Sequence, residues 1–142
     1  MFDTITGLPV HALILHLTVV GLPAMAVITI VVATRKSLRE RYSWWVTGAN
    51  AAMFVVTLIT KESGEALQEA RGGQLAIEHG QLGSLLPWFA LVLTLASAAV
   101  ATTTRNRALG PVSVVFSILA AIAATYWTIR TGDAGARAVW GS

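Results

Sequence analysis

Three histidines in a chain that has no cysteine are the residues whose chemistry stands out. His11 and His16 lie in "GLPVHALILHL", at the start of a long apolar run, and His79 lies in "AIEHGQLG". A neutral imidazole is a common ligand for metal ions and haem, and an ionisable side chain inside a membrane span is costly and marks a functional site. The lack of cysteine excludes thiolate metal sites, covalently attached c-type haem and disulfides. The histidines therefore direct attention to haem b or to a non-haem metal ion.

The composition places these histidines in a membrane protein. Hydrophobic residues make up 55% of the chain and charged residues 12%, and the mean hydropathy is +0.67, outside the usual balance of soluble domains. Transmembrane barrel strands alternate apolar and polar residues, whereas runs such as "AVITIVVA" do not. Four helices long enough to cross a hydrocarbon core of about 30 Å are predicted over residues 8–34, 43–67, 75–103 and 111–130. The sequence predicts an all-α protein, a four-helix transmembrane bundle that forms a single domain over residues 1–142.

Short connections after the first and third helices predict two helical hairpins that are joined by a longer loop. Small residues allow transmembrane helices to approach closely. The second and fourth predicted helices contain two sets of such residues: Gly48, Ala49, Ala51 and Ala52, and Ala120, Ala121, Ala123 and Ala124. We therefore expect these two helices to approach each other closely.

The basic residues set the expected orientation in the membrane. The segments "RKSLRERY" and "TTTRNRALG" hold six of the ten lysines and arginines, and such loops face the cytoplasm under the positive-inside rule. Both termini are therefore predicted to be extracytoplasmic, in a multi-pass protein of a bacterial cell membrane. No lysine or arginine precedes the first apolar run, so the first helix is expected to be retained. The net charge of +3 reflects this topology, and no nucleic-acid partner is expected.

The predicted topology gathers the histidines in the outer half of the bundle. His11 and His16 are five residues apart, which leaves them about 140° apart around an ideal helix, so they do not form an i, i+4 chelate. A haem in a helical bundle usually takes its two histidines from different helices. His16 and His79 are therefore the preferred axial pair, provided that the third helix begins near Gln74.

Three functions agree with these residues. The first is a haem b electron carrier, with His16 and His79 as axial ligands, His11 able to join the site, and Arg71, Arg130 or Arg137 paired with the haem propionates. The second is a non-haem copper, zinc or iron site that is built from His11, His16, Glu65, His79 and Asp133. The third is an accessory subunit in a homo- or hetero-oligomer, which packs against a respiratory or transport complex in the lipid bilayer, with respiratory-chain proteins or quinone as partners.

Simpler structural interpretations compete with these functions. A histidine near a helix end can lie at the headgroup boundary, which suits His11, and His16 can serve in a structural hydrogen bond. Glu65 can belong to the solvated face of a helix end. The sequence has no nucleophile and base pair, phosphate-binding loop or zinc-hydrolase spacing, so we do not expect it to be an enzyme on its own.

Four segments carry a resemblance that covers essentially the whole chain: "GLPVHALILHLTVVGLP", "TKESGEALQ", "EHGQLGSLLPW" and "TGDAGARAVW". The sequence resembles the bacterial membrane-protein family catalogued as domain of unknown function 2231, in its actinobacterial form. The resemblance implies a four-helix membrane fold and no established activity. Some relatives are fused to Rieske iron-sulfur or c-type cytochrome domains, which implies a place near electron transfer and favours haem b. Relatives often carry histidine where this chain has Asp133, which weakens Asp133 as an axial ligand.

Overall fold

Four α-helices make up the described part of the chain. The structure is a computed structural model, and it describes residues 10–70 and 77–141. The helices are α1 (Val10–Thr34), α2 (Lys36–Ala70), α3 (Ile77–Thr103) and α4 (Leu109–Trp140). No strand occurs within the described ranges. The predicted all-α, four-helix architecture is therefore confirmed.

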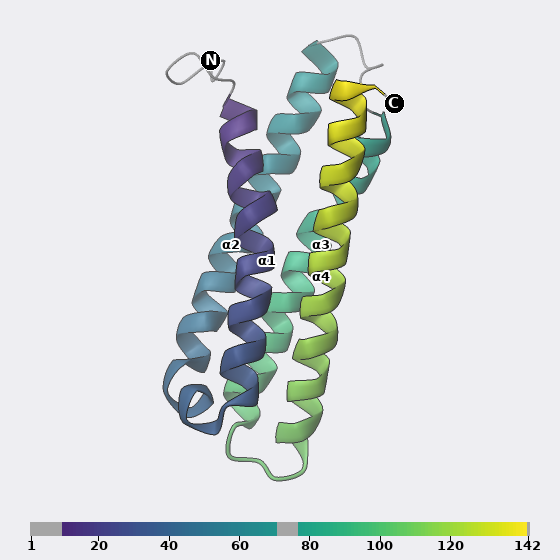
Figure 1. The fold of residues 1–142 in the computed structure, drawn as a ribbon. Helices are drawn as coiled ribbons and strands as arrows, with labels where there is room; N and C mark the ends of the chain where they lie inside the picture. The colour runs from purple at the N-terminus through teal and green to yellow at the C-terminus, as the bar shows by residue number, and fades with distance from the viewer. Residues whose placement is uncertain (1–9, 71–76, 142) are drawn as a thin grey trace.

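The helices form an up-and-down bundle in which each helix packs against two neighbours. α1 packs against α2 and α4, and α3 packs against the same two helices, so α1 and α3 lie across a diagonal. α1 begins and α4 ends at the same end of the bundle, which we call the chain-terminal end (Figure 1). The connections through Arg35 and through residues 104–108 lie at the opposite end, the loop end. Neighbouring helices therefore run antiparallel, as two hairpins require.

α2 and α4 are longer than the hydropathy pattern predicted. α2 begins at Lys36, so most of "RKSLRERY" is helical, and α4 continues through "TGDAGARAVW" to Trp140. Asn106 precedes α4, and its side-chain oxygen accepts hydrogen bonds from the backbone N–H groups of residues 108 and 109, both at 2.9 Å. Near the other end of α4, Asp133 and Arg137 form an i, i+4 ion pair that supports the helix. These added turns are polar or glycine-containing, so hydropathy alone does not reveal them.

The outer faces of the helices are apolar. All four helices are long and apolar enough to cross a membrane. Large exposed side chains on these faces include Val20, Val27, Leu95, Leu119 and Ile122. Water would favour polar residues at such positions, whereas a bilayer solvates apolar ones. The chain is therefore a multi-pass membrane protein, and its orientation with both termini outside stays a prediction.

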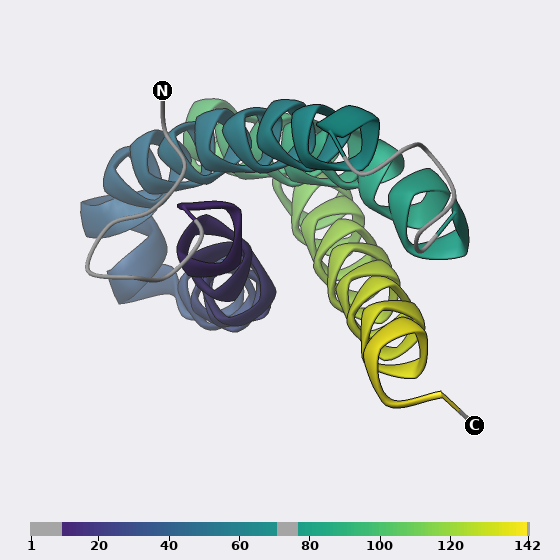
Figure 2. The ribbon, with the colours of Figure 1, turned by 90° about the horizontal axis from the view of Figure 1, so that it is seen from above.

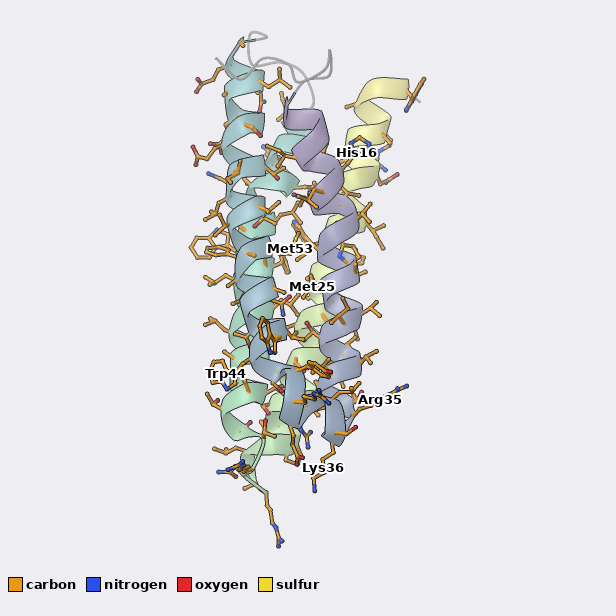
Figure 3. All side chains as sticks on the ribbon, turned by 90° about the vertical axis from the view of Figure 1, so that its left-hand side faces the viewer. His16, Met25, Arg35, Lys36, Trp44 and Met53 are labelled. Carbon is orange, nitrogen blue, oxygen red and sulfur yellow. The ribbon has the colours of Figure 1, made fainter. Side chains whose placement is uncertain are left out.

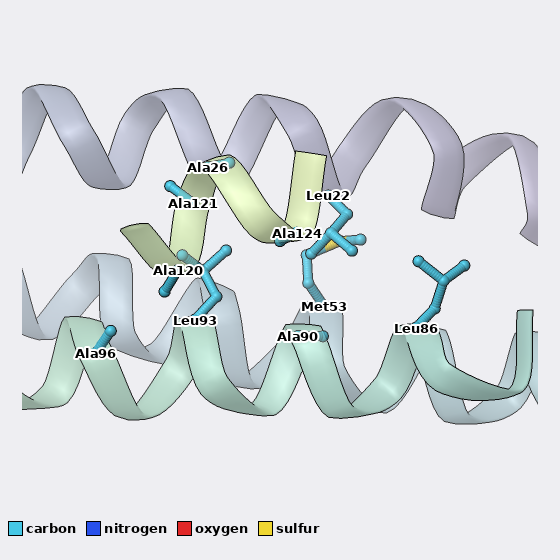
Figure 4. Packing of buried hydrophobic residues seen from close by; sticks show 10 residues of the cluster. All are labelled: Leu22, Ala26, Met53, Leu86, Ala90, Leu93, Ala96, Ala120, Ala121 and Ala124. Carbon is cyan, nitrogen blue, oxygen red and sulfur yellow. The ribbon is translucent and has the colours of Figure 1, made fainter. Parts of the chain in front are cut away.

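The core combines a few large side chains with many alanines. Leu22 of α1, Met53 of α2 and Leu93 of α3 lie near the centre of the bundle, and Leu86 of α3 lies at one end of the same cluster (Figure 4). The alanines packed with them are Ala26, Ala90, Ala96, Ala120, Ala121 and Ala124. Small side chains let helix backbones approach closely, which matters because lipid tails are as apolar as the core itself. The centre of the bundle is therefore closed by tight packing.

The expected close approach of α2 and α4 is wrong, because the two helices lie on a diagonal of the bundle. The small residues of α2 point outward: Gly48, Ala49, Ala51 and Ala52 are all exposed. Ala120, Ala121 and Ala124 of α4 do pack inward, and the neighbours of α4 are α1 and α3. The buried face of α2 instead carries Ser43, Val46, Asn50, Met53, Thr57 and Thr60. These residues recur at intervals of three and four, the spacing of a helix face that packs against neighbours.

Two polar contacts join α1 to α2 within the span. The hydroxyl oxygens of Thr18 and Thr60 are 2.7 Å apart, and Asn50 Nδ2 donates to Thr29 Oγ1 at 3.0 Å. All four side chains are buried. Interhelical hydrogen bonds in membranes contribute about 0.6 kcal/mol on average, so their larger effect here is to fix the register between the two helices.

Ala121→Leu should destabilise the bundle. Ala121 is 1% exposed, so a larger side chain there would not fit between α4 and its neighbours. Such overpacking lowers the free energy of unfolding by about 1–3 kcal/mol. Gly48→Leu is the matched control, because a Cβ added at Gly48 meets nothing within 4 Å. Thermal unfolding in detergent measures both variants. Equal losses of stability in the two would contradict this arrangement of helices.

Single cysteines test the orientation, because the chain has no cysteine of its own. Ser37 near the loop end and Glu69 near the chain-terminal end are both exposed. In intact cells, a membrane-impermeant maleimide should label Glu69→Cys, whereas Ser37→Cys should react only after permeabilisation; a gel shift measures both. The opposite labelling pattern would put the chain-terminal end in the cytoplasm.

Candidate functional site

A cleft with a volume of about 1030 Å³ opens at the chain-terminal end and is lined by all four helices. α1 and α4 diverge toward this end, as the side view and the view from above both show (Figures 1 and 2). Leu86 belongs both to the lining of the cleft and to the apolar core. The cleft therefore begins where the tight packing of the core ends.

Small residues make room for the cleft. The part of α4 that lines it includes Gly132, Gly135 and Ala136, and Gly64 of α2 and Gly80 of α3 also contribute. Glycine and alanine leave the space that larger side chains would fill. The result is a wide cavity with few bulky side chains on its α4 wall.

His79 projects from the first turns of α3 into the contact with α4. The described part of α3 begins at Ile77, so His79 belongs to a helix that crosses the membrane. Its Nδ1 atom is 2.9 Å from the backbone carbonyl oxygen of Thr131. A carbonyl can only accept a hydrogen bond, so Nδ1 carries a proton. In the neutral imidazole this contact selects the tautomer in which Nε2 keeps its lone pair and can act as a ligand.

Gly135 leaves the space that the imidazole of His79 occupies. A Cβ atom added at Gly135 would lie 2.9 Å from Nδ1 and 3.0 Å from Cε1 of His79. Gly135 follows Thr131 by one helical turn, so the two residues lie on the same face of α4. We call Thr131 and Gly135 the histidine seat, because one orients the imidazole and the other makes room for it.

Trp127 connects α4 to α3 on the loop-end side of the histidine seat. Its indole Nε1 donates to the carbonyl oxygen of Leu82 at 3.0 Å, and its ring stacks on Phe89 with 5.0 Å between centroids. Pro87 lacks a backbone N–H, so α3 is missing one of its own hydrogen bonds in this region. The contacts of Trp127 hold α3 in place there, and with it His79.

His16 lines the same cleft from α1 and is exposed; Figure 3 shows it near the start of that helix. Thr18 and Thr60 lie at a similar depth, because their hydroxyl oxygens are in contact. His16 precedes Thr18 by two residues, so it lies less than one helical turn nearer the chain-terminal end than Thr60. Gly80, next to His79, packs against Gln68, which lies farther along α2 toward the chain-terminal end. Both histidines of the preferred pair therefore line the cleft, with His79 nearer the chain-terminal end than His16.

Lys61 and Glu65 line the cleft from α2. Lys61 Nζ is 3.1 Å from Glu65 Oε1, and the side chain of Lys61 is 30% exposed, against 52% for Glu65. Glu62 is the other acidic neighbour, at 4.0 Å, and it is 75% exposed. Lys61 is therefore the least exposed of these three charged side chains.

Three site residues predicted from the sequence do not line the cleft: Arg130, Asp133 and Arg137. Asp133 forms an ion pair with Arg137, and Arg137 Nη2 also lies 3.5 Å from Glu78 Oε1. Arg130 donates to the hydroxyl of Tyr126 at 3.1 Å. Asp133, Arg137 and Glu78 therefore pair with one another on the surface of α3 and α4, and Arg130 is held by Tyr126.

The remaining predicted site residues lie outside the part of the structure that can be described. These are Arg71 and the side chain of His11. Among the described residues, no three histidine, aspartate or glutamate side chains gather closely enough to hold a metal ion. His16, Glu65 and His79 instead lie spread around the walls of the cleft.

Residues 7–142 match the family model described as predicted membrane protein (DUF2231). The chain belongs to this family. The resemblance seen in the sequence is thereby confirmed, and the description agrees with the four membrane spans of the DUF2231 protein. Comparison with curated proteins and with solved structures gave no significant match.

Three residues of the cleft in this DUF2231 protein had no role assigned from the sequence. Thr131 acts through its backbone carbonyl, which every residue type possesses. Gly135 lies in a segment that was expected to follow the last helix, whereas α4 includes it. Lys61 could have been found, because it follows the inward-facing Thr57 by one helical turn.

In the DUF2231 protein, Gly135→Ala should displace the imidazole of His79, because the added Cβ would lie within 3.0 Å of it. The hydrogen bond to Thr131 should weaken, and the tautomers of His79 should then exchange. The ¹⁵N spectrum of histidine-labelled protein in detergent reports this. Gly132→Ala is the control, since a Cβ there meets nothing within 4 Å. An unchanged His79 signal in Gly135→Ala would count against the seat.

Proposed function

We propose that the cleft binds haem b and that the protein carries electrons at its chain-terminal end. The observation that carries this proposal is the hydrogen bond that orients His79: Nδ1 donates to the Thr131 carbonyl at the wall of a large cleft. Haem and metal ligands are commonly oriented by such a second hydrogen bond, which also raises the basicity of the ligating nitrogen.

The size and lining of the cleft support a planar, largely apolar cofactor. Its volume of about 1030 Å³ lies at the upper end of the range of about 300–1,000 Å³ that is usual for ligand pockets. Gly132, Gly135 and Ala136 keep the middle of its α4 wall open, and Trp140 is the one large side chain that α4 adds to the described lining. Haem b, when bound, would supply a one-electron redox centre.

Each histidine has a distinct part in this proposal. His79 would hold the haem through Nε2, because the seat fixes its ring against α4. His16 lies across the cleft on α1 and is proposed as the second ligand, although its depth differs. Haem would thus be held by both histidines if His16 reaches it, and by His79 alone if His16 does not.

A haem site needs fewer ligands from the described residues than a non-haem metal site does. Copper, zinc or iron would need several ligands around one point, whereas Asp133 is paired with Arg137 away from the cleft. A haem needs one or two histidines in a cavity of suitable shape. Haem is therefore the better supported cofactor, and respiratory-chain proteins or quinone are the proposed electron partners.

Purified protein from haem-replete cells should show a Soret band with about one haem per chain. His79→Ala should lose most of the haem, because the seated ligand is gone. His16→Ala should keep it but shift the spectrum toward the five-coordinate form, since only the second ligand is lost. Absorption spectra and pyridine haemochrome content measure these changes.

Two outcomes would contradict the haem proposal. One is a colourless protein that contains stoichiometric copper, zinc or iron by elemental analysis. The other is full haem retention in both His16→Ala and His79→Ala. A colourless protein without metal would favour an accessory subunit. Gly132→Ala is the control variant, because it alters the same wall of the cleft without touching either histidine.

A further inference from the structure

We infer that Lys61 is the anchor for a carboxylate group of the cofactor in the cleft. This inference rests on the proposed function, in which the carboxylate is a haem propionate. It differs from the expectation drawn from the sequence, which gave this part to Arg71, Arg130 or Arg137.

The cleft offers a single lysine or arginine among the described residues that line it, and that residue is Lys61. An ammonium group at the wall of a cleft inside a transmembrane bundle is costly unless an anion lies beside it. Arg130 and Arg137 do not line the cleft, and they contact Tyr126, Asp133 and Glu78 instead. Lys61 is therefore the cation that a ligand in the cleft can reach.

The present partners of Lys61 are exchangeable. Glu65 and Glu62 are 52% and 75% exposed, whereas Lys61 is 30% exposed. Ion pairs with exposed carboxylates are weak, because water screens them and competes for both groups. A carboxylate that entered from the cleft would meet Lys61 on its more enclosed side, where the attraction is screened less. Glu65 would then turn toward solvent at little cost.

The position of Lys61 among the helices agrees with this role. His16 and His79 belong to α1 and α3, which lie across a diagonal, so α2 and α4 form the two walls between them. The α4 wall has only small, uncharged side chains near the seat, such as Gly132 and Ala136. If a ligand lies between the histidines, a carboxylate at its edge therefore finds a positive charge only on the α2 wall.

The test compares haem b with its dimethyl ester, in which both propionates are neutral. Apoprotein in detergent is titrated with each porphyrin, and binding is followed by the Soret band. The wild type should bind haem b about tenfold to a hundredfold more tightly than the ester, as expected for a hydrogen bond between charged groups. Lys61→Gln should bind both equally. Lys61→Arg should keep the preference, which shows that the charge and not the fold is responsible.

Two further variants make the result specific to Lys61. Arg130→Gln should bind like the wild type, because Arg130 contacts Tyr126 outside the cleft. Glu65→Gln should bind haem b more tightly than the wild type, because it removes the anion that competes for Lys61. Weaker binding in Glu65→Gln would contradict the inference and favour a site in which Glu65 is itself a ligand.

The outcomes separate this inference from the proposed function. If the wild type binds haem b and the ester with equal affinity, haem binding stands and the role of Lys61 is overturned. A preference for haem b that survives in Lys61→Gln overturns it as well. If neither porphyrin binds to the wild type, both proposals fail.

Discussion

The whole arrangement depends on how helices hold together when their surroundings are as apolar as their core. In lipid the association comes from close packing of small residues and from hydrogen bonds between helices. Alanines such as Ala90, Ala121 and Ala124 provide this packing in the centre of the bundle. Toward the chain-terminal end the lining changes to glycines and polar side chains, and α1 and α4 separate. The cleft is the consequence of where that close packing stops.

The helices do not separate uniformly at the cleft. α3 and α4 stay joined through Trp127 and through the hydrogen bond of His79 to Thr131. Close approach of Gly80 to Gln68 joins α3 to α2, and the Thr18 and Thr60 hydroxyls join α1 to α2. The cleft consequently opens between α1 and α4, while three of its corners are fixed. A histidine attached to the fixed α3 and α4 corner is better positioned than one on the open edge.

The sequence was sufficient for the helices but only partly for the site. Hydropathy predicts the four spans because each must remain apolar over the thickness of the membrane. It does not show which helices are neighbours, so Gly48 and Ala52 were assigned to a contact that does not exist. His16 and His79 could be predicted as residues of one end from topology alone. The histidine seat could not, because it depends on a backbone carbonyl and on the continuation of α4 past Gly132.

The length of α2 has a consequence for the behaviour of the protein in different membranes. Its 35 residues extend about 52 Å at 1.5 Å per residue, so its charged ends reach past a hydrocarbon layer of about 30 Å. When a bilayer becomes thinner than the apolar stretches of the helices, the helices adapt by tilting. The alanine-packed centre resists such a movement, whereas the ends of α1 and α4 are already apart. Lipid chain length should thus alter how widely the cleft opens, which makes the thickness of the bilayer a physical control on access to it.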